Sequence, residues 1–157
     1  MREASQKDIS KFLECKRVAF VGLSRNPNHF SRALFREFIA QGYDAVPVNP
    51  QATEIEGRPC FSRLGEITPR VEAALLMTGA PAATDQAVHE CDEAGIRNIW
   101  IYKSVTDGQD HARLVEASRL RGSAVVEGYC PFMFLPHPMF FHRAHRFLMK
   151  VTGNHPL

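Results

Sequence analysis

The sequence lacks the long apolar run of a membrane span. None of its hydrophobic stretches approaches the roughly 18 residues that a spanning helix needs. The opening segment MREASQKDIS also lacks the apolar region of a secretory signal. We therefore expect a cytoplasmic protein that does not enter membranes. The chain has 157 residues, of which 45% are hydrophobic and 23% charged, which is typical of one globular domain or slightly more.

The sequence also lacks a C-x-x-C pair. Its four cysteines lie far apart, at Cys15, Cys60, Cys91 and Cys130. This spacing excludes a disulfide framework and a zinc site of the finger type. We expect reduced and mostly buried thiols. Cys130 follows the last predicted strand and is a candidate nucleophile, although no spacing connects a histidine base with it.

No acidic residue occurs in the last thirty residues, whereas the chain as a whole has 19 basic and 17 acidic residues and a net charge of +2. The tail carries only Arg143, Arg146 and Lys150 as charged residues. Three cations are few for nucleic acid, since backbone binding commonly uses about 6–10 phosphate contacts. We therefore expect neither nucleic acid nor a membrane as a partner.

The tail has a strong helical pattern. Its apolar residues recur at helical spacing, at Phe140, Phe141, Ala144, Phe147, Leu148 and Val151. This predicts an amphipathic C-terminal helix that packs on the domain or on a second subunit. His137, His142 and His145 lie in the same segment, and we expect them in capping or surface roles rather than as metal ligands.

Short apolar runs alternate with amphipathic stretches along the rest of the chain. The runs predict strands at 17–21, 45–48, 71–77, 98–102 and 124–126. Helices are predicted after the caps Ser5 and Ser31 and over 84–94 and 111–121. Repeated strand–helix units of this kind imply an α/β fold, a doubly wound and mostly parallel sheet of about five strands.

A polar loop follows the first predicted strand. Gly22 allows the backbone to turn sharply and to approach a ligand closely, and Ser24 offers a hydroxyl group. In an open parallel sheet, ligands bind beyond the carboxyl ends of the strands, where N–H groups at a helix start can receive phosphate oxygens. Arg25 and Arg32 add positive charge. The loop is a candidate pyrophosphate site; the alternative is that Gly22 only tightens the turn and both arginines are solvated.

The end of the second predicted strand carries no carboxylate. NAD-binding proteins usually place Asp or Glu about 20 residues beyond the first glycines, where it accepts hydrogen bonds from the ribose hydroxyls. Here the strand ends at Asn49, and Asp44 lies at its other end. A carboxylate repels a phosphorylated ribose, whereas a neutral amide tolerates it. The pattern favours a ribose that carries an extra phosphate, as in coenzyme A or NADP.

Four short segments carry a family resemblance. They are VAFVGLSRNP at 18–27, PVNP at 47–50, IEG at 55–57 and LLMT at 75–78. Together they resemble the coenzyme A-binding domain, a Rossmann-like module of the succinyl-CoA synthetase alpha subunit that also occurs as small stand-alone proteins. The resemblance spans residues 15–130 and implies a Rossmann-like fold.

The resemblance also implies roles for residues at three strand ends. It places the phosphates on the first loop, the adenosine beside the second strand end and the third strand end in the same crevice. Family members frequently have a lysine where this chain has Gln51, which leaves the 3′-phosphate to Arg25 or Arg32. The expected coenzyme-binding residues are Gly22, Leu23, Ser24, Arg25, Asn26, Arg32, Val48, Asn49, Pro50, Met77, Thr78 and Pro81.

We expect three parts and one leading function. Residues 1–14 form an N-terminal helix, 15–130 the coenzyme A-binding domain and 131–157 the tail. The expected function is stand-alone binding of coenzyme A or an acyl-CoA without a complete catalytic set, with a homodimer or a partner enzyme chain as possible assemblies. Two alternatives are an NAD(P)-binding oxidoreductase or redox-sensing module, and an enzyme that acts on acyl-CoA through Cys130.

Overall fold

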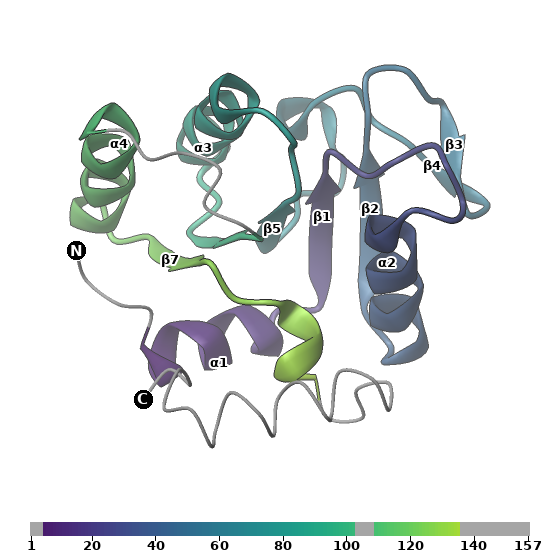
Figure 1. Ribbon diagram of the computed structural model, residues 1–157, viewed down its shortest axis with the longest axis horizontal. Coiled ribbons are helices and arrows are strands. Elements are labelled where there is room, and N and C mark those ends of the chain that lie inside the picture. The colour runs from purple at the N-terminus through teal and green to yellow at the C-terminus, as the bar shows by residue number, and fades with distance from the viewer. Residues whose placement is uncertain (1–4, 103–108, 136–157) are drawn as a thin grey trace.

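The centre of the protein is a five-stranded parallel sheet (Figure 1). A computed structural model describes residues 5–102 and 109–135. The sheet strands are β1 (Arg17–Val21), β2 (Asp44–Val48), β5 (Ala73–Leu76), β6 (Asn98–Ile101) and β7 (Ala124–Glu127). Their spatial order is β2-β1-β5-β6-β7, and every neighbouring pair is parallel. The predicted doubly wound α/β fold is therefore confirmed.

Side chains of β1 alternate between two hydrophobic cores. Val18 and Phe20 belong to one core, and Ala19 and Val21 belong to the other. In the register, Phe20 lies beside Pro47 of β2 on one side and Leu75 of β5 on the other. A strand that is buried on both faces must be apolar throughout, which explains the continuous run over 18–21.

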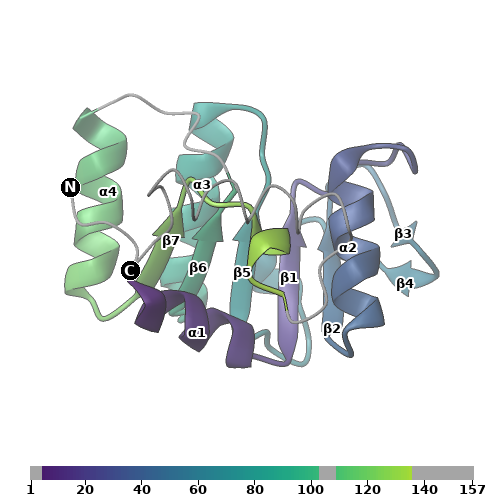
Figure 2. The ribbon, with the colours of Figure 1, turned by 60° about the horizontal axis from the view of Figure 1, so that its bottom comes forward.

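Helices cover both faces of the sheet. One face is covered by α1 (Gln6–Glu14), α2 (Phe30–Ala40) and the short 3-10 helix η2 (Pro131–Met133). The other face is covered by α3 (Pro81–Ala94), α4 (Gln109–Leu120) and the 3-10 helix η1 (Leu64–Glu66). Figure 2 shows α1 and α2 in front of the strands and α3 behind them. Loops follow the carboxyl ends of β1, β2 and β5 at one edge of the sheet.

The N-terminal helix follows the sequence prediction, and it packs on an aromatic core. The Ser5 hydroxyl accepts a hydrogen bond from the backbone N–H of Asp8 (3.2 Å) and caps α1. Phe12 of α1 packs edge-on against Trp100, with ring centroids 5.3 Å apart, and Trp100 is fully buried. The predicted helix over 140–151 lies outside the described residues.

Two predicted helix starts were wrong. The cap of α2 is His29 and not Ser31, because the His29 ring accepts the backbone N–H of Ser31 at 3.1 Å. The third helix begins at Pro81, three residues before the predicted start at 84. Proline suits the first helical position, since its fixed φ is already helical and no backbone donor is lost there.

A small hairpin was missed by the sequence analysis. The strands β3 (Glu54–Ile55) and β4 (Arg58–Pro59) pair antiparallel between β2 and η1. Glu56 and Gly57 form the turn between them, and both have positive φ angles, of 53° and 71°. The predicted strand over 71–77 is also shorter, because only Ala73–Leu76 pairs within the sheet.

Candidate functional site

The candidate site lies where β1, β2 and β5 end. Because these three neighbouring strands are parallel, their carboxyl ends meet at one edge. The chain crosses from β1 outward to β2 and then back over β1 to β5, so the direction of winding reverses between β1 and β5. In open α/β sheets, such a reversal point is where ligands bind. The residues that follow the three strands are 22–29, 49–53 and 77–80.

Gly22 lies against the end of the neighbouring strand. Its φ is +81°, and a Cβ atom on it would lie 3.0 Å from the backbone nitrogen of Thr78 and 3.1 Å from the carbonyl group of Met77. Only glycine fits this position without displacing the backbone of the 77–80 loop. Gly22 therefore serves the packing of one strand end on another, and the space that its missing side chain leaves is filled by protein.

Asn49 connects the first two loops. Its side-chain nitrogen donates to the carbonyl oxygen of Leu23 at 2.9 Å, and its side-chain oxygen accepts the backbone N–H of Gln51 at 2.8 Å. Leu23 itself is fully buried in the core, so its backbone and not its side chain borders the edge. The neutral amide of Asn49 thus fixes the shape of the loops, while exposed Pro50 is the neighbouring residue that reaches the surface.

Hydrogen bonds within the chain also order the 22–29 loop. The Ser24 backbone N–H donates to the Ser31 hydroxyl (3.1 Å), and the Ser24 hydroxyl accepts the backbone N–H of Asn26 (3.1 Å). The Asn26 side chain accepts the backbone N–H of Asn28 in turn (3.0 Å). These bonds give the loop one conformation before any ligand arrives, which lowers the entropic cost of binding.

Arg32 lies behind this loop. Its side chain is only 9% exposed and donates to the carbonyl oxygens of Ser24 (3.3 Å) and Arg25 (3.1 Å) and to the Glu56 carboxylate. In a trans peptide the N–H group points away from the carbonyl group of the same unit. The contacts of Arg32 therefore turn the N–H groups of Arg25 and Asn26 away from Arg32, and the Arg25 side chain itself is exposed.

The third strand end places threonines and a helix start beside Gly22. The Thr78 and Thr84 hydroxyl groups are 2.5 Å apart, and the Thr84 hydroxyl donates to the carbonyl oxygen of Ala80 (3.2 Å). Ala80 provides no side-chain cap for α3, and Pro81 is its first residue. The first-turn N–H groups of α3 consequently have no capping side chain, and such groups attract anions.

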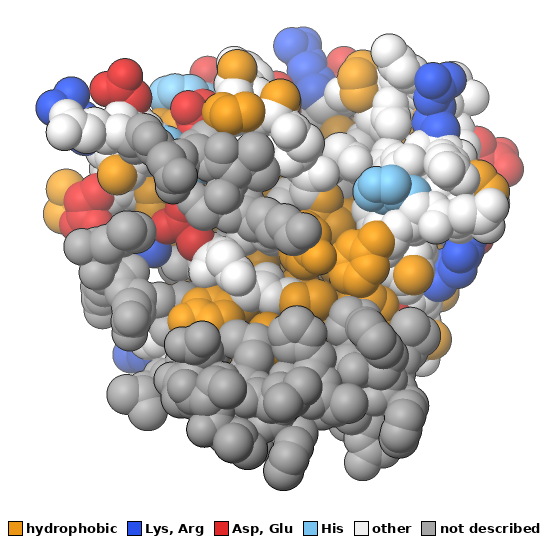
Figure 3. All heavy atoms as spheres, viewed as in Figure 1, with side chains coloured by type: hydrophobic (Ala, Val, Ile, Leu, Met, Phe, Trp, Pro, Cys, Tyr) orange, Lys and Arg blue, Asp and Glu red, His pale blue; other side chains and the backbone are white. Residues whose placement is uncertain are grey.

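An aromatic cluster packs against the hydrophobic core on the sheet face that α1 and α2 cover. Phe30, the first residue of α2, stacks on Tyr102 at the end of β6, with ring centroids 5.3 Å apart. It also packs edge-on against Phe132 of η2 at 5.6 Å. Figure 3 shows hydrophobic side chains reaching the surface in the middle of this face. Phe30 and Tyr102 are partly exposed, whereas Phe132 is buried, and partly exposed aromatic rings suit the uncharged arm of a nucleotide-linked ligand.

None of the four cysteines forms a disulfide bond, and burial makes three of their thiols unreactive. Burial raises the pKa of Cys15 to about 11, and burial also raises the pKa values of Cys60 and Cys91 above the usual value. Such thiols stay protonated near neutral pH and are poor nucleophiles. Cys130 is half-buried and precedes η2, close in sequence to the aromatic cluster.

A buried histidine with two carboxylates was missed by the sequence analysis. His111 of α4 is 5% exposed, with its ring nitrogens 2.6 Å from Asp85 of α3 and 3.0 Å from Glu127 at the end of β7. Burial lowers the pKa of His111, but the hydrogen bonds to both carboxylates outweigh this effect and raise the pKa above its usual value. Arg119 pairs with Glu127 as well (3.4 Å). The cluster ties two helices to the sheet, and it uses both ring nitrogens.

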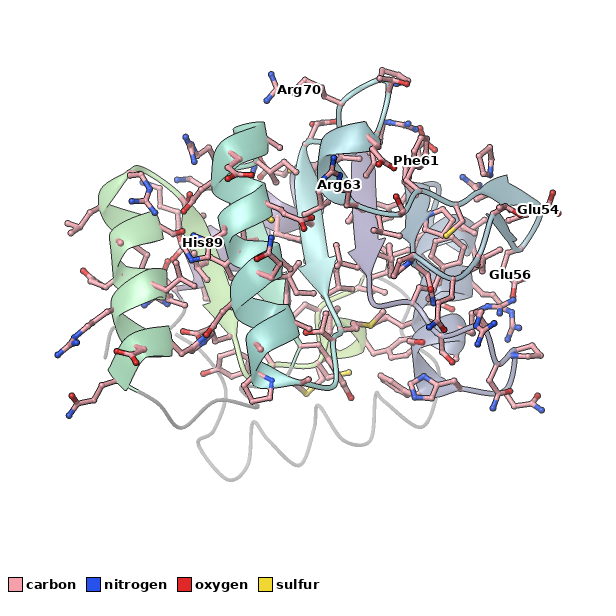
Figure 4. All side chains as sticks on the ribbon, turned by 90° about the horizontal axis from the view of Figure 1, so that it is seen from above. Glu54, Glu56, Phe61, Arg63, Arg70 and His89 are labelled. Atoms are coloured by element: carbon pink, nitrogen blue, oxygen red, sulfur yellow. The ribbon has the colours of Figure 1, made fainter. Side chains whose placement is uncertain are left out.

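A groove of about 590 Å³ lies at the opposite edge of the sheet. It opens between η1 and the second half of α3, and Figure 4 labels Arg63 and Arg70 on its η1 side. Arg70 donates to the carbonyl oxygen of Ala94 at the end of α3, and Glu90 accepts the backbone N–H of Leu64 (3.3 Å). Its charged rim residues thus serve to hold η1 and α3 together.

The described part of the chain contains neither a metal-holding cluster nor a membrane-spanning helix. Across residues 5–102 and 109–135, no group of three or more His, Cys, Asp or Glu side chains has an arrangement that could hold a metal ion. Within the same ranges, no helix is both long and apolar enough to cross a bilayer. The predicted surface histidines of the tail lie outside these ranges.

The open, all-parallel sheet with helices on both faces, and the meeting of the ends of β1, β2 and β5 at one edge, define an α/β domain of the Rossmann-like type. A family model described as CoA binding domain matches residues 16–136. Since this match covers more than half of the chain, the chain belongs to the CoA-binding domain family. The resemblance noted in the sequence is therefore confirmed.

Three individual proteins are similar to this chain in sequence or in fold. The uncharacterized protein YneT of Bacillus subtilis is 37% identical over 68 residues, which are 43% of this chain and half of the length of YneT. A conserved hypothetical protein of Pyrococcus furiosus is 26% identical, with a TM-score of 0.64 over 73% of this chain and 95% of its own. A hypothetical protein of Pyrococcus horikoshii has the same fold, with a TM-score of 0.71, 22% identity and coverage of 94% and 97%.

A larger enzyme contains the same fold as one part. The dinucleotide-forming acetyl-coenzyme A synthetase 1 of Ca. Korarchaeum cryptofilum, solved with phosphate and ADP, matches with a TM-score of 0.64 at 20% identity. The match covers 72% of this chain but only 25% of the synthetase. This similarity concerns the fold alone.

Proposed function

We propose that the protein is a stand-alone binding protein for coenzyme A or an acyl-CoA. The pyrophosphate would lie on the loop Gly22–Ser24, the adenosine beside Asn49 and Pro50, and the pantetheine arm along Met77 and the aromatic cluster. The coenzyme A-binding unit would comprise residues 15–130, with the N-terminal helix and the tail added to it. The proposal assigns no catalytic residue.

One observation carries this proposal. Arg32 binds the carbonyl groups of Ser24 and Arg25 from behind, so the backbone N–H group of Arg25 faces away from it, as an anion site requires, while the N–H group of Asn26 donates to the Ser24 hydroxyl. The uncapped start of α3 adds further N–H donors at the same edge. The family match supports coenzyme A as the anionic ligand that these donors receive.

The absence of a carboxylate at the end of β2 favours binding of coenzyme A over binding of NADH. The side chain there is Asn49, and both of its polar atoms already bond within the protein. Hydrogen bonds from the ribose hydroxyls of NADH would therefore have no carboxylate acceptor at this position. A binding experiment that compares the two ligands tests the proposal directly.

We expect coenzyme A to bind and NADH not to bind in calorimetric titrations at equal ligand concentrations. Arg25→Glu should weaken coenzyme A binding by about tenfold or more, because the exposed reversed charge lies beside the phosphates. Arg63→Glu at the opposite edge is the matched control and should leave the affinity unchanged. Binding of NADH in preference to coenzyme A would instead support the dinucleotide alternative and refute the proposal.

A further inference from the structure

Two arginines of α2 converge on a single carboxylate at the side of the candidate site. Glu56 accepts hydrogen bonds from Arg32 and from the Nε atom of Arg36 (3.0 Å), and the Arg36 Nη2 atom is 2.8 Å from the same oxygen. We call these three residues the Arg–Glu–Arg cluster. The hydrogen bonds from Arg36 and Arg32 hold the pKa of Glu56 below its usual value, so the carboxylate is charged at neutral pH.

Glu56 occupies a position that usually belongs to Gly, Asn or Asp. The Glu56–Gly57 turn has positive φ angles at both residues, and glutamate at the first of them is conformationally unfavourable. Backbone strain of this kind persists only where the surrounding structure enforces it, and it is common at functional sites. Here the turn brings the Glu56 carboxylate from the hairpin to the two arginines of α2. Figure 4 shows Glu56 at the hairpin end of the molecule, away from Arg63 and Arg70.

The two arginines of the cluster are not equivalent. The Arg32 side chain is 9% exposed and also bonds to carbonyl groups of the loop, so it is fully engaged inside the protein. The Arg36 side chain is 46% exposed. Arg36 also contacts the end of the same loop, because its Nη2 atom donates to the carbonyl oxygen of Pro27 (2.9 Å). Within the described part of the chain, the Nη1 group of Arg36 donates to no protein group.

Charge favours an anion at this place. Two guanidinium groups and one carboxylate leave the cluster with a net charge of +1. A guanidinium group has five N–H donors in a planar fork that matches a phosphate group, and Arg36, whose side chain is 46% exposed, still has unused donors on Nη1. Glu56 contacts the Nε and Nη2 atoms of Arg36. Because the guanidinium group is planar, these contacts also fix the direction of the Nη1 group. The neighbouring second strand end offers only the neutral Gln51.

We infer that Arg36 recognises the phosphate on the ribose of the bound ligand and thereby distinguishes phosphorylated from unphosphorylated adenosine groups. Glu56 is the positioning residue that orients Arg36, and Arg32 supports the loop that binds the pyrophosphate. This inference rests on the proposed function and names the residue that selects coenzyme A over its 3′-dephospho form. It transfers the role expected for Arg25 or Arg32 to a residue one turn further along α2.

The test compares coenzyme A with 3′-dephospho-coenzyme A on the full chain by calorimetry. The unaltered protein should prefer coenzyme A, and Arg36→Gln should weaken coenzyme A binding about tenfold while leaving the dephospho form unchanged. Arg36→Lys keeps the charge but loses the fork, and it should retain part of the preference. Arg63→Gln, at an exposed site of the opposite edge, should behave like the unaltered protein.

The outcomes separate the inference from the proposed function. If the unaltered protein binds neither coenzyme A nor its dephospho form, the proposed function fails. If it binds both and Arg36→Gln keeps the original preference, only the inference fails. An equal loss for both ligands, with an unchanged thermal melting curve, would show that Arg36 supports the loop through Pro27 without reading the phosphate, and it would also overturn the inference.

Discussion

Replacing Gly22 by alanine should destabilise the fold as well as the site. Alanine at a φ of +81° costs about 1–2 kcal/mol, because the left-handed region brings Cβ close to its own backbone. In addition, the new Cβ would lie 3.0 Å from the backbone nitrogen of Thr78 and 3.1 Å from the Met77 carbonyl group, and overpacking of this kind costs about 1–3 kcal/mol. We expect a loss of about 2–5 kcal/mol in the free energy of unfolding, with weaker coenzyme A binding.

Gly42 provides the matched control for this experiment. Its φ is +92°, but a Cβ atom there has no neighbour within 4 Å. Gly42→Ala should therefore cost only the conformational part, about 1–2 kcal/mol, and should leave coenzyme A affinity unchanged. Urea denaturation of both variants measures the difference. Equal losses for Gly22→Ala and Gly42→Ala would refute the argument that Gly22 is required by the close approach of β5.

Two further predictions concern the histidine cluster and the candidate nucleophile. The folded-state pKa of His111 is raised, so its stabilising contribution is complete below the unfolded pKa of about 6.5 and is lost as the pH rises through the folded pKa. The free energy of unfolding should therefore fall more steeply above about pH 6.5 in the unaltered protein than in His111→Gln, and parallel curves in urea titrations would contradict this. Cys130→Ala should bind coenzyme A with unchanged affinity in calorimetry, because the proposed contacts of the coenzyme do not include the Cys130 thiol. A large loss of affinity would show that Cys130 belongs to the binding site.

The sheet could be predicted from sequence because its physical cause is local. Strands buried on both faces require short apolar runs, and each such run in this chain forms a strand. Glycines such as Gly95, with a φ of +72°, end helices in the left-handed conformation and mark boundaries for the same local reason. The order β2-β1-β5-β6-β7 was not predicted, because the right-handed crossover rule fixes the hand of each strand–helix–strand unit and not which strands are neighbours.

The start of α2 shows where local reasoning is insufficient. Serine is a preferred cap, so Ser31 was a reasonable prediction from sequence alone. In the structure its hydroxyl accepts the backbone N–H of Ser24, seven residues earlier, and His29 caps the helix instead. The choice depends on how the 22–29 loop folds back, and this is a tertiary effect.

Charged contacts between distant segments could not be predicted either. The partners Arg32 and Glu56 are 24 residues apart, and His111 and Asp85 are 26 residues apart. Nothing in the spacing of these residues indicates a pair, because the fold of the intervening chain brings them together. The Glu56–Gly57 pair did carry a local signal, since glycine in such a position favours a two-residue hairpin turn. The two strands of this hairpin are too short to show a period-two pattern.

A crystal structure of the protein with bound coenzyme A would test the central claim most directly. We predict pyrophosphate density against the Gly22–Ser24 loop, with the adenosine beside Asn49. Density for the coenzyme in the groove between η1 and α3, or at any place other than the carboxyl edge of β1, β2 and β5, would contradict the account.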